Sequence, residues 1–340
     1  MKKESNFWKL VFGSGGVTAC NVLRAFLINK LLAVFLPPSM FACVGQLQNL
    51  MTMGQATSSL AMQNGWVSLT AQNHKDHEKM LGIWRGGFRI TTFATIFTCI
   101  AAVLFCFMAP LDLLFPGIHT RLVQAAILFS LPGILAMNIV TITSSVMNGL
   151  GEYRRWAFIG ILASFLQCVW VAFFLYSGRL SVLSIIATQS VVAGVVAAQI
   201  AGRAGFSFNV IRRTALDTRS PWFSFAIMGI VPMVLSPVVL TVMRSFIGNE
   251  FGWEAAGIWQ GIWKISDFFA VGFSAILGVV LLPKISRELS KKEFWATFNP
   301  ILFKMFGITF VVVAILFACR QWVVAILLSS SYAGAADYMP

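Results

Sequence analysis

Long apolar runs separated by short polar connectors dominate the chain. A helix that crosses a bilayer needs about 20 mainly apolar residues. Nine windows meet this requirement, at residues 12–34, 41–62, 88–108, 122–147, 156–176, 182–200, 223–246, 256–282 and 301–319. A further apolar piece, residues 322–328, is too short to span. The pattern predicts an all-α integral membrane protein with about nine transmembrane helices.

Lys and Arg are distributed unequally between the two sets of connectors. With the N-terminus placed in the cytoplasm, the outer connectors hold only Arg121, Arg179 and Arg320. The cytoplasmic side then holds sixteen basic residues, namely Lys2, Lys3, Lys9, Lys75, Lys79, Arg85, Arg154, Arg155, Arg203, Arg212, Arg213, Arg219, Lys284, Arg287, Lys291 and Lys292. This positive-inside asymmetry predicts a multi-pass inner-membrane protein with a cytoplasmic N-terminus.

Polar residues recur on one face of four predicted helices. In the eighth, the spacings of three, four and seven align Gly257, Gln260, Lys264, Asp267 and Ser274. Similar stripes are Ser14, Thr18, Asn21 and Arg24 in the first helix; Gln48, Thr52, Gln55, Ser59 and Gln63 in the second; and Asn138, Thr141, Ser145 and Asn148 in the fourth. A single Ser or Thr of this kind usually joins helices by hydrogen bonds. Four continuous stripes indicate helices around a shared wetted cavity, with lining candidates Asn21, Gln48, Gln55, Asn138 and Gln260.

Charged residues within the apolar windows are the strongest candidates for function. A charge at the bilayer centre costs about 2.5–3.5 kcal/mol even on the lenient insertion scale. The cationic candidates for substrate binding are Arg24, Lys30, Arg89, Arg244 and Lys264. Those nearer the helix ends, like Lys304, could instead extend to the interface. Since the buried acid is Asp267 alone, a cavity lined this way favours an anionic ligand.

Asp267 lies three residues from Lys264, so one helical turn can pair them. Two interpretations remain open at this point. The pair is either a structural ion pair that makes two buried charges tolerable, or a site of protonation or ion coupling.

Composition agrees with a membrane location. The chain has 340 residues, of which 58% are hydrophobic and 11% charged, and a formal net charge of +13. Soluble domains carry about 25% charged residues. No basic stripe or motif points to nucleic acid. We find no phosphate-binding loop, no metal-type His/Cys cluster and no carboxylate pair for acid–base work, so we expect neither an enzyme nor a cofactor or metal site.

A weak internal repeat divides the chain. A gapless offset of 214 residues places Lys30 on Arg244 and Gln46 on Gln260. It also places the first helix pair on the seventh and eighth helices. This is the parallel kind of transporter repeat, because an even number of helices separates the copies.

Several segments resemble one family. The eighth-helix block at residues 256–267, AGIWQGIWKISD, is the most specific. Further matches are KLLAV at 30–34, QNG at 63–65 with AQ at 71–72, LLPKISR at 281–287 and LLSS at 327–330. These segments resemble Wzx-type polysaccharide flippases, which serve O-antigen and enterobacterial common antigen synthesis. By position, Arg244, Gln260 and Asp267 match the family pattern, whereas Arg24 and Lys264 depart from it.

The resemblance implies a MATE-like fold of about twelve helices in two lobes around a cationic cavity. It implies a six-helix lobe at residues 1–215 and part of a second lobe at residues 216–340. It implies that undecaprenyl-diphosphate-linked oligosaccharide moves from the inner to the outer leaflet by alternating access, coupled to an ion gradient. Membrane lipid, polysaccharide polymerase and chain-length proteins are the implied partners. The chain ends at Pro340, where the family pattern enters a tenth helix, so we expect a fragment or an inactive truncated product.

Three other functions stay open on the sequence. A multidrug or ion antiporter of the same superfamily predicts a cavity dominated by carboxylates, whereas cations dominate here. A membrane glycosyltransferase or polymerase predicts a large polar loop with catalytic groups, and no outer connector is long enough. A non-catalytic scaffold for polysaccharide-assembly proteins is the third.

Overall fold

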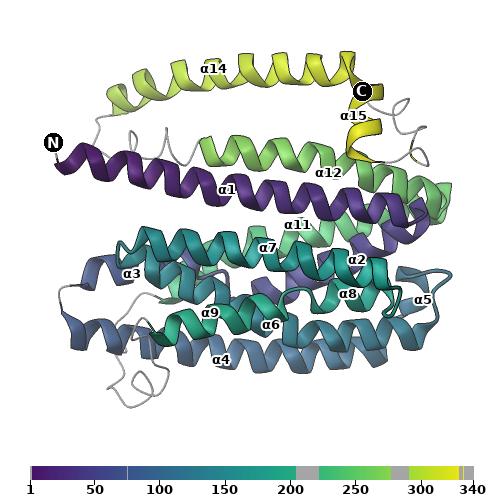
Figure 1. The fold of residues 1–340 in the computed structure, drawn as a ribbon, viewed down its shortest axis with the longest axis horizontal. Coiled ribbons are helices and arrows are strands. Elements are labelled where there is room, and N and C mark those ends of the chain that lie inside the picture. Colours follow the sequence, from purple (N-terminus) through teal and green to yellow (C-terminus); the bar gives the residue numbers. More distant parts are fainter. Residues whose placement is uncertain (1, 75, 204–221, 277–290, 329–331, 333–340) are drawn as a thin grey trace. The chain divides into compact units, whose positions relative to one another are not determined.

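The computed structural model describes residues 2–74, 76–203, 222–276, 291–328 and 332, and every element in this part of the chain is an α-helix (Figure 1). A helix lies over each of the nine predicted windows. The helices are α1 (Lys2–Phe35), α2 (Pro38–Ser59), α3 (Gln63–Asn73), α4 (His77–Met108), α5 (Leu111–Leu114), α6 (Thr120–Gly149), α7 (Tyr153–Ser177), α8 (Val182–Thr188), α9 (Val191–Arg203), α11 (Trp222–Phe251), α12 (Trp253–Ile276), α14 (Lys291–Ala318) and α15 (Arg320–Leu327).

Some sequence predictions lie outside the described residues. They are the lobe boundary at 215/216, the last part of the eighth window at 277–282, the matching segment at 281–287, and the cytoplasmic cations Lys75, Arg212, Arg213, Arg219, Lys284 and Arg287.

Five of the described helices are long and apolar enough to cross a membrane. They are α4, α6, α7, the α8–α9 segment and α11, and the bent pair α14–α15 makes six if it is one span. Helices α1, α2 and α12 are not among them. In α2 and α12, the polar and charged candidates lower the mean hydropathy. The all-α membrane fold is confirmed, and insertion of α1, α2 and α12 stays a prediction.

The chain forms two compact units. One contains Met1–Phe41 with Glu254–Pro340, and the other contains Ala42–Trp253. Each unit therefore combines segments from both lobes expected from the sequence, and the division into lobes at residue 215 stays a prediction.

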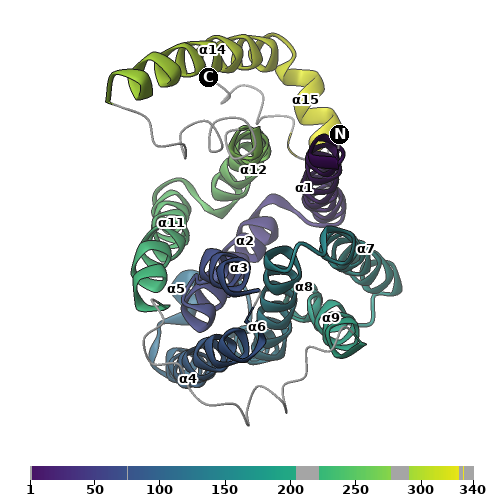
Figure 2. The same cartoon turned by 90° about the vertical axis from the view of Figure 1, so that its left-hand side faces the viewer.

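In the Ala42–Trp253 unit, α6 lies at the centre, packed against α3, α4, α7, α8 and α9 (Figure 2). Small residues allow this close packing, as is usual between membrane helices. A Cβ added at Gly133 would lie 2.5 Å from the Ala187 carbonyl oxygen of α8. A Cβ at Gly194 of α9 would collide with Ala136 of α6.

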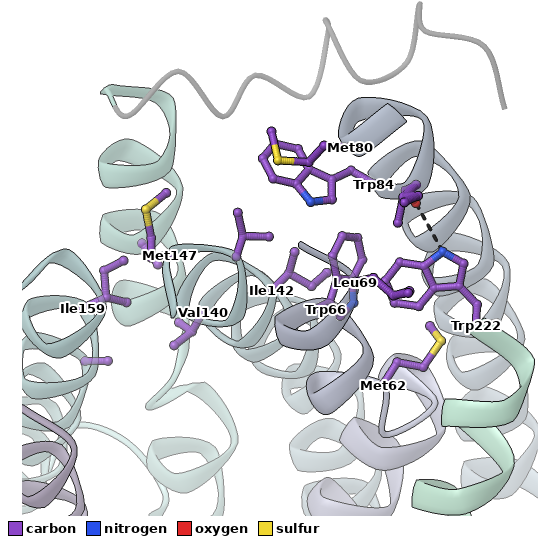
Figure 3. Close-up of a cluster of buried hydrophobic side chains, with 14 of the residues drawn as sticks. Met62, Trp66, Leu69, Met80, Trp84, Val140, Ile142, Met147, Ile159 and Trp222 are labelled. Carbon is purple, nitrogen blue, oxygen red and sulfur yellow. Dashed lines mark hydrogen bonds between the residues drawn. The ribbon is translucent and has the colours of Figure 1, made fainter. Parts of the chain in front are cut away.

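Tryptophans form the centre of the hydrophobic core at one end of this unit (Figure 3). Trp66 of α3 and Trp222 of α11 lie with ring centroids 4.8 Å apart. The indole of Trp222 donates to the Ile83 carbonyl oxygen of α4 at 3.2 Å, so the buried N–H of this indole has a partner. A Cβ at Gly87 would lie 2.7–2.8 Å from both indoles. The start of α11 is therefore fixed against α3 and α4.

The second predicted helix ends earlier than the sequence indicates. Leu60 and Ala61 have positive φ angles of 49° and 51°, and they separate α2 from α3. The left-handed region is unfavourable for residues with a Cβ. The close approach of α11 helps to hold the break, because a Cβ at Gly229 would lie 2.8 Å from Ala61 Cβ.

In the other unit, α1 and α12 run in opposite directions (Figure 1). Helix α14 bends by 81° into α15 at Cys319, and α15 reaches from the end of α14 towards α1 (Figures 1 and 2). The short apolar piece expected at residues 322–328 is therefore a separate helix. Breaks within spanning segments are common at transporter sites.

The helix bounds agree with the internal repeat. With the offset of 214 residues, the junction between α11 and α12 falls within two residues of the junction between α1 and α2. Lys30 and Arg244 thus occupy equivalent positions near the ends of equivalent helices.

Candidate functional site

Arg244 is the most deeply buried of the predicted cations. Its side chain is 1% exposed on α11, and Nη1 donates to Gln46 Oε1 of α2 at 2.7 Å. Gln46 in turn donates from Nε2 to Ser245 Oγ at 2.9 Å. Asn49, one turn along α2, donates to Thr241 Oγ1 at 3.1 Å. The repeat-equivalent cation is thus held in a polar seam between α2 and α11.

Asn138 forms a second buried polar group, between α2, α4 and α6. Its Nδ2 donates to Ser58 Oγ at 2.9 Å and to Thr95 Oγ1 at 3.4 Å. Thr95 donates to the main chain of Thr91 at 2.7 Å. One residue from each of three helices therefore meets in an apolar surrounding, where such bonds join helices.

Two contacts fix how α1 and α12 face one another. The rings of Phe26 and Phe268 meet edge to face with centroids 6.3 Å apart. A Cβ at Gly257 would collide with the Pro38 carbonyl at the start of α2. Lys30 lies four residues after Phe26 on α1, and Lys264 lies four residues before Phe268 on α12. Because the two helices are antiparallel, these two steps go in the same direction and by the same length. Lys30 and Lys264 therefore lie at one level.

The two lysines also lie on the facing sides of their helices. Lys264 is four residues from Phe268 and seven from Gly257, so it belongs to the α12 stripe that meets α1. Lys30 is four residues from Phe26 and lies on the α1 side that meets α12. Both side chains are half-buried. Two cations close together in a low-dielectric setting attract an anion and repel one another.

Lys30 already has partners in α15. Its Nζ donates to the Ala325 carbonyl oxygen at 3.0 Å and also to the Leu328 carbonyl oxygen. These groups belong to the C-terminal turn of α15, whose carbonyls carry the negative end of the helix dipole. The end of α15 therefore supplies a partial counter-charge to Lys30.

The remaining candidates are distributed along α1, α2, α4 and α12. Gln260 is buried, Arg24 is half-buried, and Asn21 and Asp267 are exposed. Gln48 and Gln55 are half-buried. Arg89 is exposed, with its guanidinium 5.9 Å from the Phe93 ring centroid. The Met1–Phe41 and Glu254–Pro340 unit thus holds six candidates, namely Asn21, Arg24, Lys30, Gln260, Lys264 and Asp267.

Curated proteins match a short part of the chain, and no protein-family model matches it. The chain is 35% identical over 69 residues to the lipid III flippase of Escherichia coli (strain K12). The matched segment covers 20% of this chain and 17% of that protein. The lipid III flippase of Shigella flexneri gives the same values. The match therefore spans less than a fifth of these relatives' length.

Solved structures match over nearly all of the chain. The inward-facing form of a multidrug resistance MATE family transporter of the MOP superfamily has a TM-score of 0.68 and 15% identity, covering 95% of this chain and 76% of the transporter. The outward-facing form of a multidrug resistance MATE family transporter has a TM-score of 0.61 and 17% identity. This match covers 97% of this chain and 76% of the transporter. A MOP superfamily transporter from Pyrococcus furiosus has a TM-score of 0.60 and 14% identity, and the match covers 97% of this chain and 76% of the transporter. That transporter is described as having a binding pocket of reverse polarity. The chain has the MATE fold.

The MATE fold confirms the expectation drawn from the apolar windows and from the resemblance. The proteins with this fold, and the two curated relatives, are transporters and flippases, which agrees with the expectation that the chain is not an enzyme.

Sequence reasoning missed the partners of two cations. Gln46 and Asn49 bind α11, whereas the predicted α2 stripe ran through Gln48 and Thr52. The internal repeat had placed Lys30 on Arg244 and Gln46 on Gln260, so it singled out both residues without pairing them with each other. For Lys30, the apolar piece after the ninth window gave no sign that its carbonyls would turn back to α1.

Proposed function

We propose that the protein flips an undecaprenyl-diphosphate-linked oligosaccharide from the cytoplasmic to the periplasmic leaflet of the bacterial inner membrane by alternating access. Lipid III, the carrier of enterobacterial common antigen, or an O-antigen repeat unit is the proposed cargo. The short identity with lipid III flippases supports this cargo. The N-terminus lies in the cytoplasm, and polysaccharide polymerase and chain-length proteins are the proposed partners.

The facing pair Lys30 and Lys264 carries the proposal. A diphosphate bears charge on several oxygens, so two ammonium groups at one level can bind it together. Arg24 lies six residues before Lys30 on α1, about 9 Å along the helix and about 120° around it, and is a further cationic candidate. The sequence makes Arg89 and Arg244 further candidates for substrate binding, and Asn21, Gln48, Gln55, Asn138 and Gln260 candidates for lining a sugar path. The lipid tail stays in the bilayer, and exposed Asp267 is the proposed group for ion coupling.

Complementation tests this function. The gene is expressed in an Escherichia coli strain that lacks its lipid III flippase, and surface enterobacterial common antigen is measured. We expect the antigen to return with the native residues and to be lost with Arg24→Ala or Asp267→Asn. Normal antigen with both substitutions, at equal protein level, would show that the proposed site is wrong.

Multidrug or ion antiport is the second candidate, because the structural likeness includes a multidrug resistance transporter. A cavity for cationic drugs would need acidic groups, whereas the facing residues on α1 and α12 are lysines. Drug-susceptibility tests of the expressing strain separate the two functions. Raised resistance to cationic drugs without restored antigen would favour antiport.

A further inference from the structure

The broken helix α14–α15 ends in the place where the proposed function puts an anion. Leu328, at the end of α15, is buried, and a Cβ added at Gly261 of α12 would lie 2.8 Å from Leu328 Cδ1. The same residue offers its carbonyl oxygen to Lys30 of α1. The end of α15 therefore contacts both α1 and α12, beside Lys30.

Tyr332 extends this anchorage beyond the helix. Its side chain is fully buried, and its hydroxyl donates to the Leu36 carbonyl oxygen at 3.5 Å. Its ring meets Phe41 edge to face, with centroids 5.7 Å apart. The ring contact and the hydroxyl bond hold Tyr332 near α1 and Phe41 without any charge. Lys30 supplies the charged part of the attachment.

We propose that Lys30 is a latch that exchanges between the α15 carbonyls and the diphosphate of the substrate, so that binding of the anion releases the end of α15. The latch rests on the proposed function, because it needs an anionic ligand at the two lysines. Lys30 is then a positioning residue for α15 as well as a ligand.

Competition between the two partners follows from charge. The ammonium of Lys30 donates to neutral carbonyls in α15, whereas each ionised oxygen of a diphosphate carries an opposite charge that attracts the ammonium further. The carbonyls of α15 carry only the partial charge of a helix end, about half an elementary charge in total. A diphosphate between Lys30 and Lys264 therefore displaces α15. In its absence, the carbonyls of α15 keep Lys30 as their hydrogen-bond donor.

A cysteine pair reports the position of α15. Gly261→Cys and Leu328→Cys are introduced into a chain whose six native cysteines are replaced by alanine, and the rate of copper-catalysed crosslinking is measured in nanodiscs. A second pair, Phe26→Cys with Phe268→Cys, reports the α1–α12 contact and serves as the matched control. The probe is farnesyl diphosphate, and farnesol, which lacks the diphosphate, is its control.

We expect farnesyl diphosphate, but not farnesol, to slow crosslinking between positions 261 and 328 at least threefold, with no change at positions 26 and 268. Lys30→Met should give the slow rate without any probe and no further response. Lys30→Arg should keep both the fast rate and the response, because a guanidinium also donates to carbonyls and phosphates.

Binding is measured in parallel by the shift in thermal stability with farnesyl diphosphate. A stabilised protein whose crosslinking rate does not change contradicts the latch and leaves the anion site in place. A protein that the probe neither stabilises nor slows contradicts the anion site and the latch with it. A Lys30→Met chain that keeps the fast rate also contradicts the latch, whatever the probe does.

Discussion

The guanidinium of Arg244 on α11 donates a hydrogen bond of 2.7 Å to the side-chain oxygen of Gln46 on α2. Both residues are buried, with 1% of each side chain exposed. The internal repeat places Lys30 at the position of Arg244, and Lys30 likewise donates to a neighbouring helix. In each unit, the cation at the equivalent position therefore donates to a neighbouring helix, Arg244 to α2 and Lys30 to α15.

Replacing Gln46 should destabilise the protein. Gln46→Leu leaves the buried guanidinium without this acceptor, and a hydrogen bond to a charged group is worth about 1.5–3 kcal/mol. We expect a clearly lower thermal midpoint of the purified protein in detergent. Gln48→Leu, on the half-buried neighbouring position, is the matched control and should change the midpoint little. Equal midpoints for the two variants would show that the Arg244–Gln46 bond contributes nothing.

Asn138 should matter for the packing of α2, α4 and α6. Asn138→Leu removes its bonds to Ser58 and Thr95, with an expected loss of about 1–2 kcal/mol, since interhelical hydrogen bonds in membranes are worth about 0.6–1.7 kcal/mol each. Chemical denaturation in mixed micelles measures it. Thr52→Val is the control, because the exposed Thr52 hydroxyl donates only to its own helix, at Gln48. A loss no larger than that of the control would contradict the role of Asn138.

The aromatic core should not tolerate a methyl group at Gly87. In Gly87→Ala the new Cβ would lie 2.7–2.8 Å from the rings of Trp222 and Trp66. Overpacking of this kind costs about 1–3 kcal/mol. Gly307→Ala on α14 is the control, since no atom lies within 4 Å of its added Cβ. Thermal midpoints in detergent measure both, and a Gly87→Ala protein as stable as the Gly307→Ala protein would contradict the packing shown in Figure 3.

The orientation predicted from the Lys and Arg distribution can be checked directly. Single cysteines in a cysteine-free chain, at Gly151 between α6 and α7 and at Gly178 after α7, should lie on opposite sides of the membrane. We expect a membrane-impermeant maleimide added to whole cells to label position 178 and not position 151. Labelling of position 151 alone would reverse the orientation.

The sequence predicted the helices well and their breaks poorly. Apolar length and hydrophobic period are local properties, so a helix was found at every window. The breaks at Leu60–Ala61 and at Cys319 depend on contacts with distant helices, such as Gly229 against Ala61. No Gly or Pro occupies positions 60 and 61 to mark the first break.

The candidate site was predictable as a set of residue types but not as a set of partners. The cost of charges in a membrane singled out Arg24, Lys30, Arg244 and Lys264 as candidates. Their role in substrate binding stays a prediction. Helical spacing alone cannot decide which of two adjacent faces packs inward, so Gln48 was chosen over Gln46. Likewise, the level shared by Lys30 and Lys264 depends on the packing of Phe26 against Phe268.

Movement of a diphosphate lipid across vesicles tests the central claim most directly. The purified protein is reconstituted with a fluorescent polyprenyl-diphosphate-linked oligosaccharide, and the fraction accessible to an external quencher is followed. We predict flipping by the native chain, at least tenfold slower flipping by Lys264→Met, and unchanged flipping by Arg179→Gln, which removes an exposed cation after α7. Flipping that is equally fast in all three proteins, or transport of a cationic drug in place of the lipid, would contradict the account.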